Sequence, residues 1–201
     1  MENPVDTTFP RINYDAFWMR MCNKHFKTSH CSYHGNSWKQ CYAENFTKNL
    51  ICNYKIEQNI NQVLSYFKTF SEYIFNLELP TFPAGFDISL ITGWFVNLTS
   101  LEIKYSPELQ DDKNVNFLKK KLTPIKDEYT KFGMRFADIK KFAISIGEMD
   151  YLLNISLQGN FIDDEMIKYL STGLITNNTL RYLDLSNNHL TEIGYFINKK
   201  N

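Results

Sequence analysis

Three cysteines and three of the chain's four histidines fall within one short window near the N-terminus. Thiolate and imidazole groups are the ligands that Zn²⁺ prefers, and two such groups separated by two residues can chelate one ion. The window contains two pairs with this separation, Cys22 with His25 and Cys31 with His34. The first chemistry to consider is therefore a structural zinc site.

The local pattern favours a different role for the same residues. Cys22 and Cys41 each fall in the apolar stripe of an expected helix, where a free thiol packs as a small hydrophobic group. His25, His30 and His34 lie in a polar loop or at a helix end, where histidines are usually solvated. The longer loop that normally separates two pairs of zinc ligands is absent. We therefore expect packed thiols and surface histidines, with no bound metal or other cofactor.

No catalytic pattern is recognisable elsewhere in the chain. The sequence has no P-loop, no HExxH segment and no Ser-His-Asp order. The acidic runs at 111–112 and 163–165 are typical of a solvated loop and of a helix N-terminus. The sequence therefore predicts a protein that is not an enzyme.

Composition and charge exclude several classes of partner. Lys plus Arg equals Asp plus Glu, at 22 residues each, so no overall field attracts the chain to nucleic acid or to an anionic membrane. No stretch approaches the ~20 apolar residues of a membrane span, and the first residues lack the pattern of a signal peptide. We expect a cytoplasmic protein whose four cysteines are reduced.

Apolar residues at helical spacing predict three short helices in the first part of the chain. Asn36 or Ser37 is available as the N-cap of the second helix. Three amphipathic helices ahead of a sheet would shield its first apolar layer. The stripe residues are Tyr14, Phe17, Trp18, Met21 and Cys22; then Trp38, Cys41, Tyr42 and Phe46; then Ile60, Val63, Leu64 and Phe67.

Internal repetition dominates the second half of the chain. The segment TLRYLDLSNNHL fits the leucine-rich repeat pattern LxxLxLxxNxL, and LLNISLQGNFI repeats it upstream. The residues of LxL lie on one face of a short strand and point inward, while the Asn satisfies backbone groups where the chain turns. Acidic residues followed by an apolar stripe predict an α-helix between the two copies. The pattern residues are Leu152, Ile155, Leu157, Asn160 and Ile162, the helical residues Met166, Ile167, Leu170 and Leu174, and the second copy Leu180, Leu183, Leu185, Asn188 and Leu190.

The fold class that follows is α/β, a leucine-rich repeat solenoid of the ribonuclease-inhibitor-like kind with a small α-helical N-terminal cap. Three weaker copies lie upstream at irregular spacing and lack the Asn. A repeat cannot bury its own apolar faces and needs a neighbour or a cap on each side. We expect a leader over 1–13, a helical cap over 14–70 and a repeat array over 71–201 that is incomplete at its C-terminal end. The weaker copies contain Ile74, Leu77 and Leu79; Leu98, Leu101 and Ile103; and Tyr129, Phe132 and Met134.

The exposed positions between the inward-facing residues are the candidate protein-binding residues, because solenoids present their strand surface to partners. Arg181 and Tyr182 are the strongest candidates, since Arg and Tyr often dominate interface energies. Glu102 and Lys104 occupy the matching places in an earlier repeat. The candidates in the last two repeats are Asn154, Ser156, Gln158, Arg181, Tyr182 and Asp184.

Three segments in one order carry a family resemblance: FWMRMCNKHF at 17–26, SYHGNSWKQCYAENF at 32–46 and SEYIFNLELP at 71–80. Together they resemble the family of dynein regulatory complex subunit 5, also called the T-complex-associated testis-expressed protein 1 family. That family has an aromatic-Trp helix, an HGxSWK segment and a leucine-rich array in this order, with further repeats after them. The most specific piece here is HGNSWK at 34–39.

The resemblance implies a non-enzymatic scaffold subunit of the nexin-dynein regulatory complex in the cytoskeleton of the ciliary or flagellar axoneme. That complex links neighbouring doublet microtubules and regulates dynein-driven motility. The implied partners are other subunits of the complex in a hetero-oligomeric assembly. Dynein arms and the doublet microtubule are further candidates. The three lysines at 119–121 have the charge to contact acidic tubulin, but a charge run of this length is more often a solvated helix face.

An F-box-type leucine-rich repeat substrate receptor of a ubiquitin ligase is the alternative. A Trp helix followed by an SWK helix also resembles the segment that follows an F-box. The F-box helices themselves would have to precede Tyr14, where only MENPVDTTFPRIN stands.

Overall fold

The N-terminal part of the chain folds into three α-helices, each where an apolar stripe predicts one. The computed structural model describes residues 14–28, 30–55, 58–83, 86–104 and 136–192, so the expected leader lies outside the described residues. The elements of this part are α1 (Tyr14–Phe26), α2 (Trp38–Cys52), α3 (Ile60–Phe70) and the short 3₁₀ helix η1 (Ser71–Tyr73).

An aromatic cluster holds the three helices together. The ring of Trp18 lies 5.1 Å from that of Tyr42, and the rings of Phe46 and Phe70 lie 5.6 Å apart. Ser37 is the N-cap of α2, and its hydroxyl accepts a hydrogen bond from the backbone N–H of Gln40 at 3.3 Å. The sequence predicted the apolar stripes and left Asn36 and Ser37 as the two candidates for this cap, of which the structure has Ser37.

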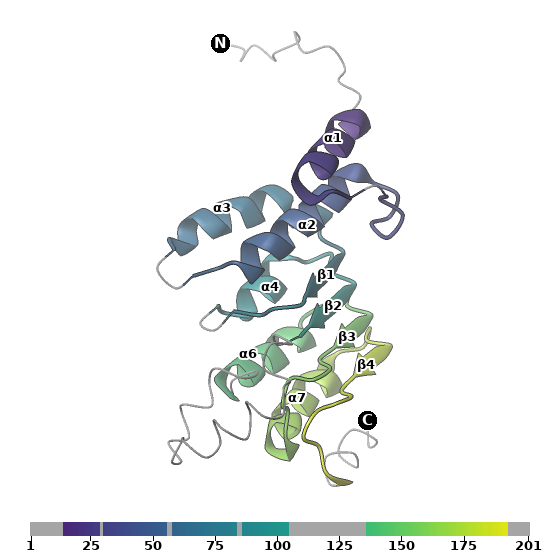
Figure 1. Ribbon diagram of the computed structural model, residues 1–201. Helices are drawn as coiled ribbons and strands as arrows, with labels where there is room; N and C mark the ends of the chain where they lie inside the picture. The colour runs from purple at the N-terminus through teal and green to yellow at the C-terminus, as the bar shows by residue number, and fades with distance from the viewer. Residues whose placement is uncertain (1–13, 29, 56–57, 84–85, 105–135, 193–201) are drawn as a thin grey trace, which may run out of the picture.

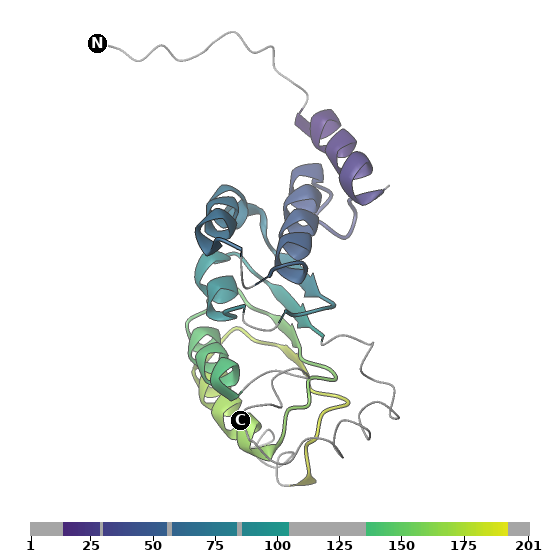
Figure 2. The same cartoon turned by 60° about the vertical axis from the view of Figure 1, so that its left-hand side comes forward.

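Four parallel strands follow, and each pairs with the next in chain order. Figure 1 shows the strands stacked along one side of the molecule, with α4, α6 and α7 along the other, and Figure 2 shows the same separation from a second direction. The mixed α/β class is thereby confirmed. The strands are β1 (Asn76–Leu79), β2 (Ser100–Ile103), β3 (Asn154–Ser156) and β4 (Tyr182–Asp184), and the helices between them are α4 (Ser89–Trp94), α6 (Phe136–Gly147) and α7 (Asp164–Thr176).

The inward-facing residues form rows across the sheet. Leu77, Leu101, Ile155 and Leu183 are paired in register from β1 to β4. The first three are almost completely buried, whereas Leu183 is only half-buried because β4 is the last described strand. Burying such side chains against the helices stabilises the fold by about 1.5–3 kcal/mol each.

The two asparagines of the repeat pattern stabilise the turns after the strands, as predicted. The side-chain oxygen of Asn188 accepts hydrogen bonds from the backbone N–H groups of Asn160 and Ile162, at 2.9 and 3.0 Å. Its amide donates to the carbonyl oxygen of Leu157 at 2.8 Å. Asn160 repeats only the donor half of this arrangement one unit earlier: its amide donates to the carbonyl oxygen of Ile103 at 2.8 Å, and its buried side-chain oxygen accepts no hydrogen bond from the described residues. Each Asn therefore joins two successive units through a backbone carbonyl that its amide satisfies.

The third of the weaker repeats, with Tyr129, Phe132 and Met134, lies outside the described residues. Within the described sheet, Ser100 of β2 pairs directly with Asn154 of β3.

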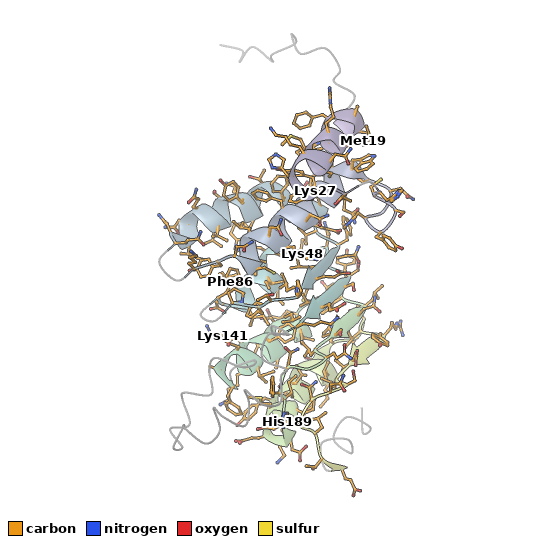
Figure 3. All side chains as sticks on the ribbon, in the orientation of Figure 1. Met19, Lys27, Lys48, Phe86, Lys141 and His189 are labelled. Atoms are coloured by element: carbon orange, nitrogen blue, oxygen red, sulfur yellow. The ribbon has the colours of Figure 1, made fainter. Side chains whose placement is uncertain are left out.

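The helix side is fixed by close contacts between successive helices. Ala143 of α6 and Gly173 of α7 touch so closely that a β-carbon on Gly173 would lie 1.8 Å from the carbonyl oxygen of Ala143. Lys141 of α6 donates to Asp87 Oδ2 at 2.6 Å and ties α6 to the segment before α4. Figure 3 labels Lys141 and also Phe86, the residue next to Asp87 in that segment. Burial opposes ionisation of Asp87, but its hydrogen bonds with Lys141 and Ser89 outweigh burial and lower its pKa.

Each unit of the sheet begins with the same pair of backbone hydrogen bonds. The N–H groups of Leu153 and Asn154 both donate to the carbonyl oxygen of Thr99, at 2.8 and 3.0 Å. Those of Arg181 and Tyr182 donate to the carbonyl oxygen of Leu153 at the same distances. The preceding unit thus supplies one acceptor for two donors of the next.

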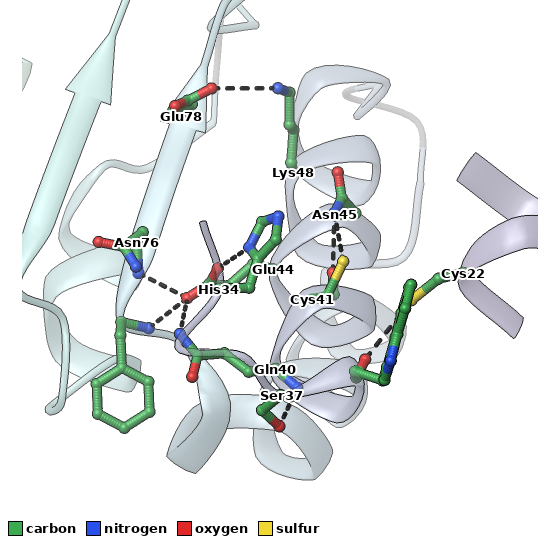
Figure 4. Close-up of polar contacts among 12 residues, drawn as sticks. Cys22, His34, Ser37, Gln40, Cys41, Glu44, Asn45, Lys48, Asn76 and Glu78 are labelled. Carbon is green, nitrogen blue, oxygen red and sulfur yellow. Dashed lines mark hydrogen bonds and ion pairs between the residues drawn. The ribbon is translucent and has the colours of Figure 1, made fainter. Parts of the chain in front are cut away.

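No strand precedes the first unit in the described part of the chain, and the buried carboxylate of Glu44 supplies its acceptor. Glu44 Oε1 accepts hydrogen bonds from the backbone N–H groups of Phe75 and Asn76, at 3.0 and 2.8 Å (Figure 4). It also accepts one from Gln40 Nε2 at 3.0 Å, and Oε2 pairs with His34 Nδ1. His34 is therefore a structural partner of a buried acid, which corrects its interpretation as a solvated histidine.

Candidate protein-binding surface

The cysteine and histidine window serves packing in the N-terminal helices. Cys22 and Cys41 are completely buried, and Cys22 Sγ donates to the carbonyl oxygen of Trp38 at 3.5 Å. Burial, with a smaller contribution from Cys41, raises the pKa of the Cys22 thiol to about 12, so the thiol stays neutral. His30 is exposed, and His25 is exposed with its ring 6.1 Å from that of Tyr42. Within the described part of the chain, no three His, Cys, Asp or Glu side chains gather in a way that could hold a metal ion.

The face of the sheet opposite the helices carries two cross-strand rows of polar residues. Strand pairing places one residue of each row on every strand, directly beside its neighbours. The first, which we call the polar row, is Asn76, Ser100, Asn154 and Tyr182. The second, which we call the acidic row, is Glu78, Glu102, Ser156 and Asp184.

The structure places the six candidate binding residues on or beside these rows. Asn154 and Tyr182 belong to the polar row, and Ser156 and Asp184 belong to the acidic row. Arg181 directly precedes β4, whereas Gln158 follows the end of β3. Arg181 is exposed and Tyr182 is 57% exposed, while the other four are half-buried.

Two carboxylates of the acidic row form ion pairs with lysines of the same chain. Glu102 forms an ion pair with Lys104, and Glu78 Oε2 lies 3.7 Å from Lys48 Nζ of α2. The hydrogen bond that Lys104 donates to Glu102 raises the pKa of Lys104, and the charges of Glu78 and Asp184 act on it in the same direction. Lys104 therefore lies in the common field of all three carboxylates.

Asp184 is held in its charged form by the turn that follows β4. Its Oδ1 accepts a hydrogen bond from the backbone N–H of Ser186 at 2.9 Å. The backbone and hydroxyl groups of Ser186 lower the pKa of Asp184, and Ser156 and Lys104 contribute less. Asp184 makes no ion pair with any described residue, so its charge is balanced only by the more distant Lys104.

Sequence reasoning missed several residues of this face. Glu78 and Lys48 were not singled out, although Glu78 stands between two inward-facing aliphatic residues just as Glu102 does. Leu153 and Tyr151, which precede β3, are 41% and 60% exposed. No local signal marked Leu153 as exposed, because it directly follows Leu152 of the repeat pattern, which is completely buried.

The fold and this surface define the class of protein: a mixed α/β protein of stacked strand-and-helix units, whose sheet face carries rows of polar residues. In the described part of the chain, no helix has the length and apolar character to span a membrane.

Comparison with known proteins finds two curated relatives of the same name. The chain is similar to dynein regulatory complex subunit 5 of Mus musculus, with 22% identity over 225 aligned positions, covering 96% of the chain and 42% of the relative. It is equally similar to dynein regulatory complex subunit 5 of Chlamydomonas reinhardtii, with 22% identity over 175 positions, covering 84% of the chain and 40% of the relative. No protein-family model matches the chain.

These matches confirm the resemblance inferred from the sequence and give no support to the F-box alternative. The chain spans about two fifths of the length of the curated relatives it matches.

Proposed function

We propose that this chain belongs to a non-enzymatic scaffold subunit of the nexin-dynein regulatory complex, located in the axoneme of cilia or flagella. The observation that carries the proposal is the similarity to dynein regulatory complex subunit 5 in two distant organisms, over 96% and 84% of the chain. In this role it assembles with other subunits of the complex and supports the links between doublets that regulate dynein-driven motility.

The architecture we propose for this role is a leucine-rich repeat solenoid over residues 71–201, closed at its start by a helical cap over 14–70. The sequential order of the strands and the asparagine contacts between units support this interpretation. The Glu44 carboxylate supports the cap, because it completes the hydrogen bonds of the first unit. Such a scaffold needs no catalytic group, since its action is to hold partners at fixed positions.

The proposed contact surface is the exposed sheet face around β3 and β4. Tyr182 offers a large, exposed aromatic side chain beside the exposed Arg181, a composition typical of residues that dominate interfaces. Asn154, Ser156, Gln158 and Asp184 surround them with hydrogen-bonding groups that are already partly desolvated.

The test is the double substitution Arg181→Glu with Tyr182→Ala in the full-length protein of a ciliated cell. We expect a normal fold, because both side chains are exposed, and at least tenfold less co-purification of other complex subunits. The matched control is Lys168→Glu with Thr172→Ala, two exposed positions on α7 away from the strands. Equal recovery of subunits with both variants would show that the sheet face is not the contact surface.

A further inference from the structure

The acidic row points to the chemistry of the partner segment. We propose that the row recognises a basic, extended segment of a neighbouring subunit, with Lys or Arg at alternate positions. This inference rests on the proposed function, because it names the kind of segment that the sheet face of the scaffold would bind. It concerns Glu78, Glu102 and Asp184, which strand pairing places on β1, β2 and β4 with Ser156 between the last two.

Charge is the first argument. Three carboxylates lie in one row and face two lysines of the same chain, Lys48 and Lys104. The Glu78 side chain is 71% exposed, and Asp184 pairs with no cation among the described residues. The row therefore keeps one carboxylate more than it has lysines beside it, and an incoming cation adds charge-assisted hydrogen bonds there.

Lys104 is the second argument, because it shows that the row already holds a cation. Its ammonium group pairs with Glu102 and lies in the field of Glu78 and Asp184. The Lys104 side chain is 45% exposed, and an ion pair this exposed contributes little stability. A guanidinium group from a partner can therefore take its place, with two parallel hydrogen bonds to a carboxylate in place of one.

Spacing is the third argument. Neighbouring strands lie about 4.8 Å apart, so the acidic row spans about 14 Å from β1 to β4. In an extended peptide that crosses the strands, alternate side chains lie about 6.8 Å apart. Three basic residues at alternate positions thus match the length of the row. Beside it, the exposed ring of Tyr182 offers a face for a cation at the β4 end.

The experiment measures binding of labelled peptides to the purified chain by fluorescence anisotropy, at low and at physiological salt. The probes are a peptide that alternates Arg with Ser, a second with the same composition but its Arg residues in one block, and a third that alternates Glu with Ser. We expect the alternating Arg peptide to bind several-fold more tightly than the blocked peptide, with weaker binding at higher salt. The Glu peptide should not bind.

Two variants with the same change in net charge locate the binding. Glu102→Gln with Asp184→Asn removes charge from the row, while Asn at 184 keeps an oxygen to accept from Ser186. Glu148→Gln with Asp150→Asn neutralises two exposed carboxylates before β3, outside the row. The row variant should weaken binding of the alternating peptide about tenfold, and the control less than twofold. Equal weakening by both, equal binding of both Arg peptides, or binding of the Glu peptide would overturn the inference.

The same row variant, placed in the full-length protein in ciliated cells, separates this inference from the proposed function. Retention of the row variant in the axoneme with all other subunits would refute recognition of a basic segment and leave the scaffold role standing. Absence of the unmodified protein from the axoneme would instead refute the scaffold role. Loss of subunits with the row variant alone is the result we expect.

Discussion

At the scale of single residues, the carboxylate of Glu44 does the work of a backbone carbonyl. In the later units of the sheet, a carbonyl oxygen of the preceding unit accepts from two successive N–H groups, and at β1 Glu44 Oε1 accepts them. A buried carboxylate is costly without partners, but Glu44 has four, including His34 and Gln40. A charged group can therefore lie 3% exposed at the junction of cap and sheet.

Substituting Glu44 tests this arrangement. Glu44→Ala leaves the N–H groups of Phe75 and Asn76 without an acceptor and should lower the free energy of unfolding by about 2–3 kcal/mol. Glu44→Gln keeps an acceptor oxygen and should cost less. Denaturant titration of both variants checks the order, and an alanine variant as stable as the unmodified chain would contradict this role.

Cys22 gives a residue-scale prediction about pH. Only the thiolate reacts with alkylating agents, and burial raises the pKa of Cys22 to about 12, so at pH 8 its thiol is protonated as well as inaccessible. Iodoacetamide should leave Cys22 unmodified in the folded chain at pH 8 and modify it fully in denaturant. Peptide mass spectrometry measures both states, and rapid modification of Cys22 in the folded chain would show that α1 does not pack as described.

At the scale of elements, the contact between α6 and α7 depends on a residue without a side chain. The backbone of Ala143 occupies the space where a β-carbon on Gly173 would lie, so the two helices can approach this closely only with glycine at 173. α6 and α7 are the helices that precede and follow β3 in the chain, so this contact packs two successive units against each other.

Gly173→Ala should therefore destabilise the chain by about 1–3 kcal/mol, as expected for overpacking. Gly93 in α4 is the matched control, because a β-carbon there would meet no atom within 4 Å. Gly93→Ala should raise stability by about 0.5–1 kcal/mol through helix propensity. The midpoint temperature of thermal unfolding should fall for Gly173→Ala and rise for Gly93→Ala. A shift in the same direction for both variants would contradict the close packing of α6 against α7.

The elements were predictable where the signal is local. The apolar stripes predicted α1, α2 and α3, and Ser37 was one of the two candidate caps of α2. The repeat pattern predicted β3 and β4 with α7 between them. Two features depend on long-range contacts and could not be found this way. Glu44 meets β1 across 31 and 32 positions, and β2 meets β3 past a long intervening segment.

The candidate surface was also predictable only where the signal is local. Alternation along a strand identifies Tyr182 and Asp184 as outward-facing from local sequence alone. That Asp184 shares one row with Glu102 and Glu78 depends on strand register, which the irregular spacing of the upstream copies concealed.

At the scale of the whole molecule, cap and sheet share one hydrophobic core. The rings of Phe67 in α3 and Phe95 after α4 lie 4.8 Å apart, and both are completely buried. Because this contact and Glu44 join the two parts, we expect them to unfold together. Tryptophan fluorescence from a Trp94→Phe variant, which reports only on Trp18 and Trp38 of the cap, and far-UV circular dichroism should give one coincident denaturant transition. Two separated transitions would show independent parts.

The central claim concerns where this molecule works and with what. The most direct measurement is expression of the tagged full-length protein from its own gene in a ciliated cell, followed by mass spectrometry of the fraction retained in demembranated axonemes. The account predicts retention along the axoneme together with other dynein regulatory complex subunits. A protein that is lost on demembranation, or retained without any of those subunits, would contradict it.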